Sequence, residues 1–203
     1  MNLRIGGDRK LKTPKTIRPT SSKVRSALFN IWQHHLGGAT WLELCAGSGA
    51  MSAEALRRGA KQVVAIEMDA AACKIIQANL AKISQPQQFH ILKMDVVKAI
   101  AKLQGSFDLI YFDPPYDSNL YLPVLTHLHR LCHAATQIAV EHSSYHPLPE
   151  TVGELVQTDR RSYGQTCLSF FALATGVPAP HPSPPPLGLA PFPQIPPTQS
   201  DSI

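Results

Sequence analysis

Short apolar runs alternate with helical patterns through the middle of this chain. Apolar runs bounded by turn residues predict buried strands, and apolar positions three and four apart predict helices. Strands are predicted over 41–45, 62–67, 89–93, 107–112 and 137–141, and helices over 50–58, 70–83, 96–103 and 120–132. Because strands that alternate with single helices form parallel sheets covered on both faces, we expect an α/β fold.

A helix and a hairpin are predicted on either side of this alternation. The Thr-Ser-Ser run at 20–22 offers N-caps for a helix that continues to about His35, before Gly37-Gly38. Its expected apolar face consists of Val24, Leu28, Ile31 and Trp32, with Phe29 as an alternative. Segments 152–158 and 167–173, with Gly164 between them, predict an antiparallel C-terminal hairpin in a mostly parallel sheet.

Composition divides the chain into three parts. We expect a basic arm and helix over 1–38, a catalytic domain over 39–175 and a proline-rich tail over 176–203. Half of the positions from 178 to 197 are proline. Such a segment cannot bury enough apolar surface to offset the entropy of ordering it, so we expect the tail to be disordered. Pro184–Pro186 would also suit binding by an SH3 or WW domain.

Positive charge is concentrated at the N-terminus. The first 25 residues carry eight Lys or Arg and one acidic residue, whereas the rest of the chain carries 11 basic and 13 acidic residues. A basic arm on a slightly acidic body is typical of proteins that bind a polyanion such as nucleic acid. A targeting peptide is the alternative. It is disfavoured because no apolar stretch follows the charges, and Gly6-Gly7 and Pro14 interrupt any amphipathic helix.

The cysteines and histidines indicate neither a disulfide framework nor a metal site. Cys45, Cys73, Cys132 and Cys167 have no paired spacing, which is typical of reduced thiols in a cytosolic protein. His127, His129 and His133 lie near Cys132, but only His129 and His133 would share a face of the predicted helix. We therefore expect a solvated helix there. No apolar run is long enough to cross a membrane.

A glycine-containing turn, Glu43-Leu-Cys-Ala-Gly-Ser-Gly49, ends the first strand of the alternation. Glycines let backbone amides approach a ligand, and the helix that follows points its N-terminus at that ligand. The next strand ends in Glu67, twenty residues after Gly47. A carboxylate there can accept hydrogen bonds from both hydroxyls of a ribose. Together these features predict a site for an adenosine-containing cofactor.

The acids at the strand ends favour a cationic cofactor. Glu43, Glu67, Asp95 and Asp113 lie there, and Ser52 occupies the place where a dinucleotide-binding motif would have Gly or Ala. Four carboxylates suit neither a pyrophosphate nor a triphosphate, but they suit a sulfonium that carries ribose and adenine. Asp95 has two compatible roles: to accept a hydrogen bond from the adenine amine and to cap the next helix.

The strand 107–112 runs directly into Asp113-Pro114-Pro115-Tyr116, and Asp117 and Ser118 follow as expected helix caps. The prolines fix the backbone and leave carbonyls free to accept hydrogen bonds. Asp113 and a proline carbonyl can each accept one N–H of an exocyclic base amine, while the ring of Tyr116 stacks on the base. These four residues are the candidate catalytic residues, acting by positioning and by stabilising developing charge.

These motifs stand in the order of the class I S-adenosylmethionine-dependent methyltransferases, which the chain resembles. Over residues 3–173 it is similar to the bacterial RsmD family, most specifically in Arg4-Ile-Gly-Gly7, Arg9-Lys-Leu11, Arg18-Pro-Thr20 and Val24-Arg-Ser-Ala-Leu-Phe-Asn30. The resemblance implies a Rossmann-like seven-stranded sheet and S-adenosyl-L-methionine as the methyl donor. It also implies methylation of a guanine N2 amine in ribosomal RNA of an assembled or assembling small subunit.

The motifs and the resemblance together define the expected site. The expected cofactor-binding residues are Glu43, Cys45, Ala46, Gly47, Ser48, Gly49, Glu67, Met68 and Asp95. The expected RNA-binding residues are Arg4, Arg9, Lys10, Lys12, Arg18 and Arg25. We expect a cytoplasmic, monomeric enzyme that uses no metal.

Four other functions are compatible with parts of the pattern. A DNA adenine-N6 or cytosine-N4 methyltransferase uses the same four-residue box, but no target-recognition domain fits between Asp69 and Asp113. A protein-glutamine methyltransferase usually has Asn at the position of Asp113. A nicotinamide-dependent oxidoreductase is disfavoured by Ser52 and by the box. A non-catalytic RNA-binding module would be marked by a damaged turn or box, and both are intact here. The segment 117–119 does not identify the target base.

Overall fold

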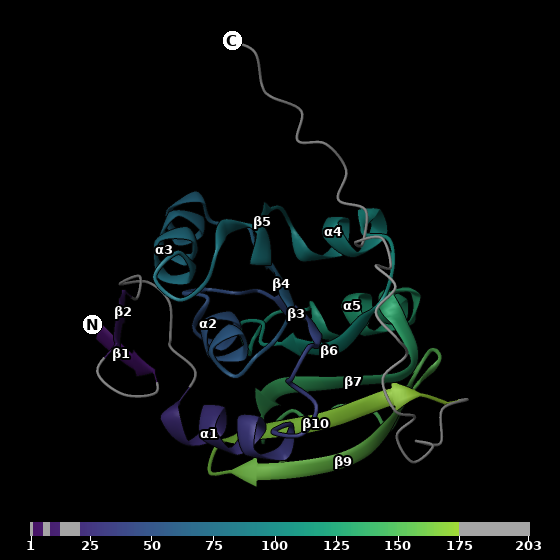
Figure 1. The fold of residues 1–203 in the computed structure, drawn as a ribbon. Coiled ribbons are helices and arrows are strands. Elements are labelled where there is room, and N and C mark those ends of the chain that lie inside the picture. The colour runs from purple at the N-terminus through teal and green to yellow at the C-terminus, as the bar shows by residue number, and fades with distance from the viewer. Residues whose placement is uncertain (1, 6–8, 13–20, 175–203) are drawn as a thin grey trace.

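An eight-stranded sheet with the order β5-β4-β3-β6-β7-β10-β9-β8 forms the centre of the molecule (Figure 1). The computed structural model describes residues 2–5, 9–12 and 21–174. The first five strands in this order are parallel, and β10, β9 and β8 continue the sheet antiparallel. The strands are β3 (Thr40–Leu44), β4 (Gln62–Glu67), β5 (Phe89–Lys93), β6 (Phe107–Phe112), β7 (Cys132–Ser143), β8 (Thr151–Val152), β9 (Leu155–Tyr163) and β10 (Thr166–Leu173).

Helices cover both faces of the sheet (Figure 1). On one side lie α1 (Ser22–Ile31), α2 (Ala50–Arg57) and α3 (Ala70–Leu80), and on the other lie α4 (Val96–Lys102) and α5 (Tyr121–Leu128). The period of two along β3 supplies both cores, because Trp41 packs with α1–α3 while Leu42 and Leu44 pack with α4 and α5. The expected α/β architecture with a mostly parallel sheet is confirmed.

The sheet differs from the expected one at its C-terminal edge. The predicted hairpin is present as β9 and β10, with β9 extending to Tyr163. The resemblance implied seven strands, and the eighth is the two-residue β8, which pairs through Thr151 and Val152 with the start of β9.

The α1 helix begins where the hydroxyl residues predicted. Ser21 is its N-cap, and the Ser21 side chain accepts a 3.2 Å hydrogen bond from the Val24 amide. The buried face includes Phe29, whose ring stacks on Trp41 of β3. Ile31 is 39% exposed, so the expectation that it belongs to this face was wrong.

The N-terminal arm contains two short antiparallel strands, β1 (Asn2–Ile5) and β2 (Arg9–Lys12). They lie against α2 and α3, and Leu11 is buried in the core on that side. The pattern analysis did not predict this pair. Arg18 and the proline-rich segment 176–203 lie outside the described residues.

The element after the candidate catalytic segment was predicted too long. The α5 helix begins at Tyr121 with no side-chain cap, so Asp117 and Ser118 do not cap it, and the helix ends at Leu128. A 3-10 turn over His129–Leu131 follows, and β7 starts at Cys132. His133 therefore lies on a strand and not on a helix. The cause is tertiary, because Cys132 pairs with Phe107 and the Thr136 hydroxyl donates to the Phe107 carbonyl.

Among the described residues, no helix combines the length and apolar character needed to cross a membrane.

Candidate active site

A cavity of about 830 Å³ lies at the carboxyl ends of the five parallel strands. In an open α/β sheet this edge is where ligands bind. The cavity is lined by residues at the end of each strand or just after it: Glu43, Cys45, Ala46, Gly47 and Ser48 at β3, Glu67, Met68 and Asp69 at β4, Met94 and Asp95 at β5, Asp113 to Asp117 at β6, and Glu141, Ser143, Tyr145 and His146 at β7. Of the predicted cofactor and catalytic residues, all but Gly49 line it.

The turn after β3 has the left-handed backbone that its glycines allow. Gly47 and Gly49 have φ of 55° and 68°, and Cys45 has φ of 62°, the single non-glycine with positive φ in the described part of the chain. A Cβ at Gly49 would lie 2.8 Å from a side-chain carbon of Ile76 in α3. Helix α3 also holds the turn by a 3.0 Å hydrogen bond from the buried Asn79 side chain to the Ser48 carbonyl. The sequence analysis identified the glycines but not Ile76 and Asn79.

Glu67 joins the end of β4 to this turn. Its Oε2 accepts a 2.8 Å hydrogen bond from the Gly47 amide, and its Oε1 accepts a 2.9 Å bond from the Asp69 amide. Each oxygen has a further lone pair. The carboxylate is thus held in place at the cavity wall and keeps acceptor capacity for a ligand hydroxyl.

Glu43 lies beneath the N-terminus of α2. Its Oε2 accepts a 2.8 Å hydrogen bond from the Ser52 amide and a second bond from the Ser52 hydroxyl. The N-cap of this helix is Gly49, which has no side chain to act as a cap, so the Glu43 carboxyl satisfies an amide of the first turn instead. Burial raises the pKa of Glu43 to about 7, even though the bonds from Ser52 act to lower it. The group is therefore sensitive to pH and to any nearby positive charge.

Asp95 and Met68 line the cavity where β5 and β4 end. Asp95 caps α4, because its Oδ1 accepts a 3.0 Å hydrogen bond from the Lys98 amide. The predicted cap is confirmed, and Asp95 lines the cavity as well. Met68 is 72% exposed, which places an apolar side chain at the cavity mouth.

The Asp113–Tyr116 segment continues β6 into the cavity. The Asp113 amide donates a 3.4 Å hydrogen bond to the Leu44 carbonyl of β3, and the Ser118 amide donates a 2.9 Å bond to the Pro115 carbonyl. The second bond closes a turn that leads the chain away from the sheet. Pro114 is buried and Pro115 is exposed, so the segment forms a rigid edge of the cavity.

Tyr116 is anchored by two strands that follow it in the chain. Its hydroxyl donates a 2.9 Å hydrogen bond to Oε1 of Glu141 in β7 and lies 2.9 Å from the Thr166 hydroxyl of β10. Burial, together with the Glu141 carboxylate, raises the pKa of Tyr116. The other oxygen of Glu141 accepts a 2.6 Å bond from Tyr111 of β6. Glu141 is a site residue that the sequence analysis missed, although it ends a predicted strand as the other acids do.

Cys45 lines the cavity but is poorly suited to nucleophilic chemistry. Burial raises the pKa of its thiol to about 12, and the Glu67 carboxylate adds to this effect. The thiol is therefore protonated at neutral pH. Among the described residues no cluster of three or more His, Cys, Asp or Glu could hold a metal ion.

The predicted RNA-binding residues fall into two groups, apart from Arg18, which lies outside the described residues. Arg4, Arg9, Lys10 and Lys12 lie on β1 and β2, and the structure describes the backbone but not the side chains of these four residues. Arg25 is different, because α1 turns it inward and only 9% of it is exposed. Burial lowers the pKa of Arg25, and the carboxylate of Glu54 opposes this effect. A surface contact with RNA does not fit this position.

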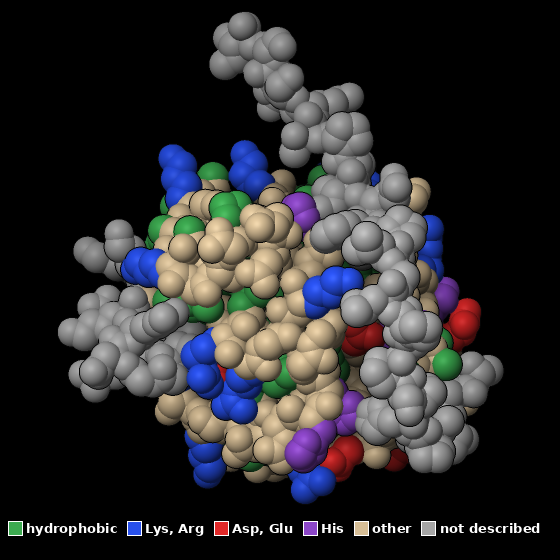
Figure 2. Space-filling view, in the orientation of Figure 1, with side chains coloured by type: hydrophobic (Ala, Val, Ile, Leu, Met, Phe, Trp, Pro, Cys, Tyr) green, Lys and Arg blue, Asp and Glu red, His purple; other side chains and the backbone are tan. Residues whose placement is uncertain are grey.

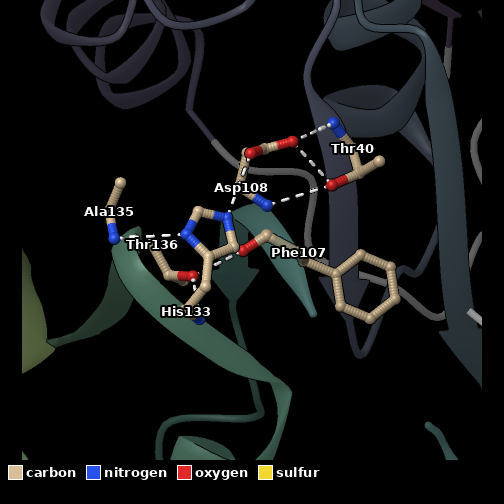
Figure 3. A network of polar contacts seen from close by, with 6 residues as sticks. All are labelled: Thr40, Phe107, Asp108, His133, Ala135 and Thr136. Atoms are coloured by element: carbon tan, nitrogen blue, oxygen red, sulfur yellow. Dashed lines mark hydrogen bonds and ion pairs between the residues drawn. The ribbon is translucent and has the colours of Figure 1, made fainter. Parts of the chain in front are cut away.

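A polar network outside the cavity lies at the other end of the strands, where β3, β6 and β7 begin (Figure 3). Oδ2 of Asp108 accepts 2.7 Å hydrogen bonds from the Thr40 amide and hydroxyl, and Oδ1 lies 3.1 Å from Nε2 of His133. The Ala135 amide donates to Nδ1 of His133, so Nε2 carries the proton that Asp108 accepts. This network joins the starts of β3, β6 and β7 and lies outside the cavity.

Comparisons with known proteins identify relatives of this chain. The family described as Conserved hypothetical protein 95 matches residues 4–172. Protein YlbH of Bacillus subtilis, provisionally named an rRNA methyltransferase, is 30% identical over 82% of this chain and 96% of its own length. Ribosomal RNA small subunit methyltransferase D of Escherichia coli K12 is 33% identical, over 57% of this chain and 61% of its own.

Solved structures show the same fold. The Escherichia coli protein yhhF, provisionally named a methyltransferase, superposes with a TM-score of 0.73 and 25% identity, covering 81% of this chain and 92% of that one. SMU.776, provisionally named a methyltransferase and complexed with SAH, has a TM-score of 0.59 at 15% identity, covering 74% of this chain and 48% of that one.

Proposed function

Because this chain belongs to the RsmD family, we propose that it transfers a methyl group from S-adenosyl-L-methionine to the N2 amine of a guanine in small-subunit ribosomal RNA. The observation that carries the proposal is the cavity, which brings the glycine turn, the carboxylates of Glu43, Glu67 and Asp95, and the Asp113–Tyr116 segment together at one edge of the sheet. The names of the relatives support ribosomal RNA as the substrate.

The residues near β3, β4 and β5 fit the proposed cofactor. Glu67 keeps acceptor capacity for ribose hydroxyls beside the glycine turn, and Asp95, which lines the same cavity, would accept a hydrogen bond from the adenine amine. Glu43 has a pKa of about 7, so an adjacent sulfonium would favour its charged form. When bound, S-adenosylmethionine supplies an electrophilic methyl group on a positively charged sulfur.

The residues after β6 fit the acceptor base. Asp113 and a proline carbonyl accept the two N–H groups of the exocyclic amine and turn its lone pair toward the methyl donor. Tyr116 holds the plane of the base, and Glu141 and Thr166 hold Tyr116. Positive charge develops on the amine nitrogen as the methyl group moves, and the Asp113 carboxylate stabilises it. The cationic product then releases a proton to solvent, so no strong base is needed beforehand.

The basic side chains suggest where RNA approaches. On the face shown in Figure 2, many of the visible Lys and Arg side chains lie over α1, α2 and α3, whereas the others lie on the side that carries most of the visible Asp and Glu. Exposed basic residues within or just after these helices are Lys23, Arg57, Lys61, Lys74 and Lys82. The β1–β2 arm lies against α2 and α3, and its sequence adds further basic residues. We propose that this face and the arm bind the RNA backbone.

Replacing Asp113 tests the proposed chemistry. We expect Asp113→Ala to abolish methyl transfer to small-subunit particles from cells that lack the protein, while calorimetry gives S-adenosylmethionine affinity within about tenfold of wild type. Glu150→Ala, which changes an exposed acid outside the cavity, is the matched control. Mass spectrometry of the RNA nucleosides identifies the methylated amine. Wild-type protein with no affinity for S-adenosylmethionine would refute the proposal. Methyl transfer to DNA and not to RNA would show that the acceptor is DNA.

The arm is tested by salt dependence. Reversing the charge at Lys10, Lys12 and Arg18 should weaken RNA binding and flatten its dependence on salt, because each lost phosphate contact reduces the number of released counterions. An unchanged slope would remove the arm from the RNA-binding surface.

A further inference from the structure

The walls of the cavity follow the order of the strands. Along the sheet edge Asp95 follows β5, Glu67 ends β4, the glycine turn follows β3 and Asp113 follows β6. The proposed cofactor uses the first three positions and the acceptor amine uses the fourth. The end of β7 is next in this row, so the residues there face the part of the substrate beyond the amine. The cavity residues of the turn that follows β7 are Tyr145 and His146.

Tyr145 places a solvated aromatic ring in this wall. It is 71% exposed, and the other large hydrophobic side chains that are exposed in the described part are Ile31, Met68 and Leu122. Single exposed apolar residues are common on protein surfaces, so such a residue indicates a binding site only where it lines a cavity. Met68 and Tyr145 line the cavity, whereas Ile31 and Leu122 do not. Met68 lies at the cofactor end and Tyr145 lies at the acceptor end.

Hydrogen bonds fix the backbone of the turn that carries Tyr145. The Tyr145 amide donates a 3.2 Å hydrogen bond to the Ser143 hydroxyl, and the His146 amide donates a 3.2 Å bond to the Ser143 carbonyl. The Ser144 amide donates a 2.9 Å bond to the Gln165 carbonyl, which ties the turn to the hairpin between β9 and β10. The ring of Tyr145 is therefore presented from a fixed backbone.

The ring of buried His142 adds further hydrogen bonds to this turn. Its Nδ1 lies 2.9 Å from the Ser143 carbonyl and 3.1 Å from the His146 carbonyl, so Nδ1 carries the proton. Its Nε2 then accepts from the Ser169 hydroxyl of β10 at 2.9 Å. Both ring nitrogens are used within the fold. A rigid support under an exposed aromatic ring reduces the entropy that a bound ligand would otherwise have to remove.

We infer that Tyr145 is a stacking platform for an RNA base on the acceptor side of the cavity. Aromatic rings stack on unpaired bases, and this is the usual means of gripping single-stranded or flipped-out nucleotides. The inference rests on the proposed function and extends it, because it assigns a second aromatic contact to the substrate besides Tyr116. The platform holds the target base or the nucleotide beside it.

Three variants separate stacking from packing. Tyr145→Ala should raise the KM for small-subunit particles about tenfold, the loss typical of one base–aromatic stack. Tyr145→Phe keeps the ring and should restore KM to within about twofold of wild type. Leu122→Ala truncates an exposed apolar side chain outside the cavity and serves as the control. All three variants should keep the wild-type melting temperature and S-adenosylmethionine affinity.

Crosslinking gives a readout besides activity. A photoreactive phenylalanine derivative at position 145 should crosslink to the RNA of the particle, and the same group at position 122 should not. An active wild-type enzyme whose Tyr145→Ala variant keeps its KM, or whose position 145 fails to crosslink, would overturn the inference and leave the proposed function intact. A wild-type enzyme without methyl transfer would overturn both.

Discussion

The Tyr116 hydroxyl donates a 2.9 Å hydrogen bond to Oε1 of Glu141, which ties the proposed catalytic segment to the end of the neighbouring strand. The second oxygen of Glu141 accepts from Tyr111, so one buried carboxyl group receives two tyrosine hydroxyls. Buried charged groups persist where their hydrogen bonds are satisfied, and here both oxygens have partners. The orientation of Tyr116 therefore depends on Glu141.

Removing this bond should slow methyl transfer. Tyr116→Phe keeps the aromatic ring but loses the anchor, and we expect kcat to fall about tenfold, in the range of one hydrogen bond to a charged group. Glu141→Gln should have a similar effect. The double variant should be less impaired than the product of the two, because both changes remove the same interaction. Tyr121→Phe is the control, since its hydroxyl makes only a long 3.4 Å contact with the Glu141 carbonyl. Fully multiplicative effects would show that the two residues act independently.

The Gly49 position should tolerate no side chain. Gly49→Ala would combine a left-handed backbone with a Cβ 2.8 Å from Ile76, and we expect the free energy of unfolding to fall by about 3 kcal/mol. Gly38 has a similar φ of 78° but open space around it. Gly38→Ala should therefore cost only about 1 kcal/mol, which is the backbone contribution alone. Urea denaturation measures both, and equal losses would rule out the clash with α3.

Binding of S-adenosylmethionine should strengthen as pH rises through 7. The pKa of Glu43 is raised to about 7 by burial, so the carboxyl group is largely protonated below this pH and charged above it. A sulfonium cation favours the charged form. Calorimetry between pH 6 and 8 should therefore give a falling Kd for S-adenosylmethionine in the wild type. Glu43→Gln should flatten this dependence, and so should the uncharged sulfur of S-adenosylhomocysteine as ligand. A flat wild-type profile would contradict a role for Glu43 charge in binding.

Acid should weaken the Asp108 network at the starts of β3, β6 and β7. Burial acts to raise the pKa of Asp108, but hydrogen bonds from His133 and Thr40 outweigh it and hold the pKa at about 2. Because the folded-state pKa is depressed, the stabilisation is fully present above the unfolded value near 4 and is lost as pH falls toward 2. Asp108→Asn should therefore reduce the dependence of unfolding free energy on pH in this window. The exposed Asp117→Asn serves as control, and an unchanged profile in Asp108→Asn would assign the acid sensitivity elsewhere.

Much of the site could be predicted because its chemistry is local in sequence. The ends of parallel strands meet at one edge of a sheet, so identifying strands 41–45, 62–67, 89–93 and 107–112 was enough to bring Glu43, Glu67, Asp95 and Asp113 together. Each of these strands is a short apolar run with clear boundaries, and β4, β5 and β6 begin and end where the pattern placed them. Ser21 and Asp95 likewise cap helices as predicted, since a cap involves only neighbouring residues.

The tertiary structure decided what depends on distant partners. Helix α5 gives way to β7 because Cys132 pairs with Phe107, although the local pattern favours a longer helix. The inward position of Arg25 and the contact of Ile76 with the Gly49 turn follow from how α1 and α3 pack, which periodicity does not encode. Glu141 was visible as the end of a strand, but its two tyrosine partners come from other segments. Sequence alone therefore determined which chemical groups meet at this edge, and packing determined how each one is held.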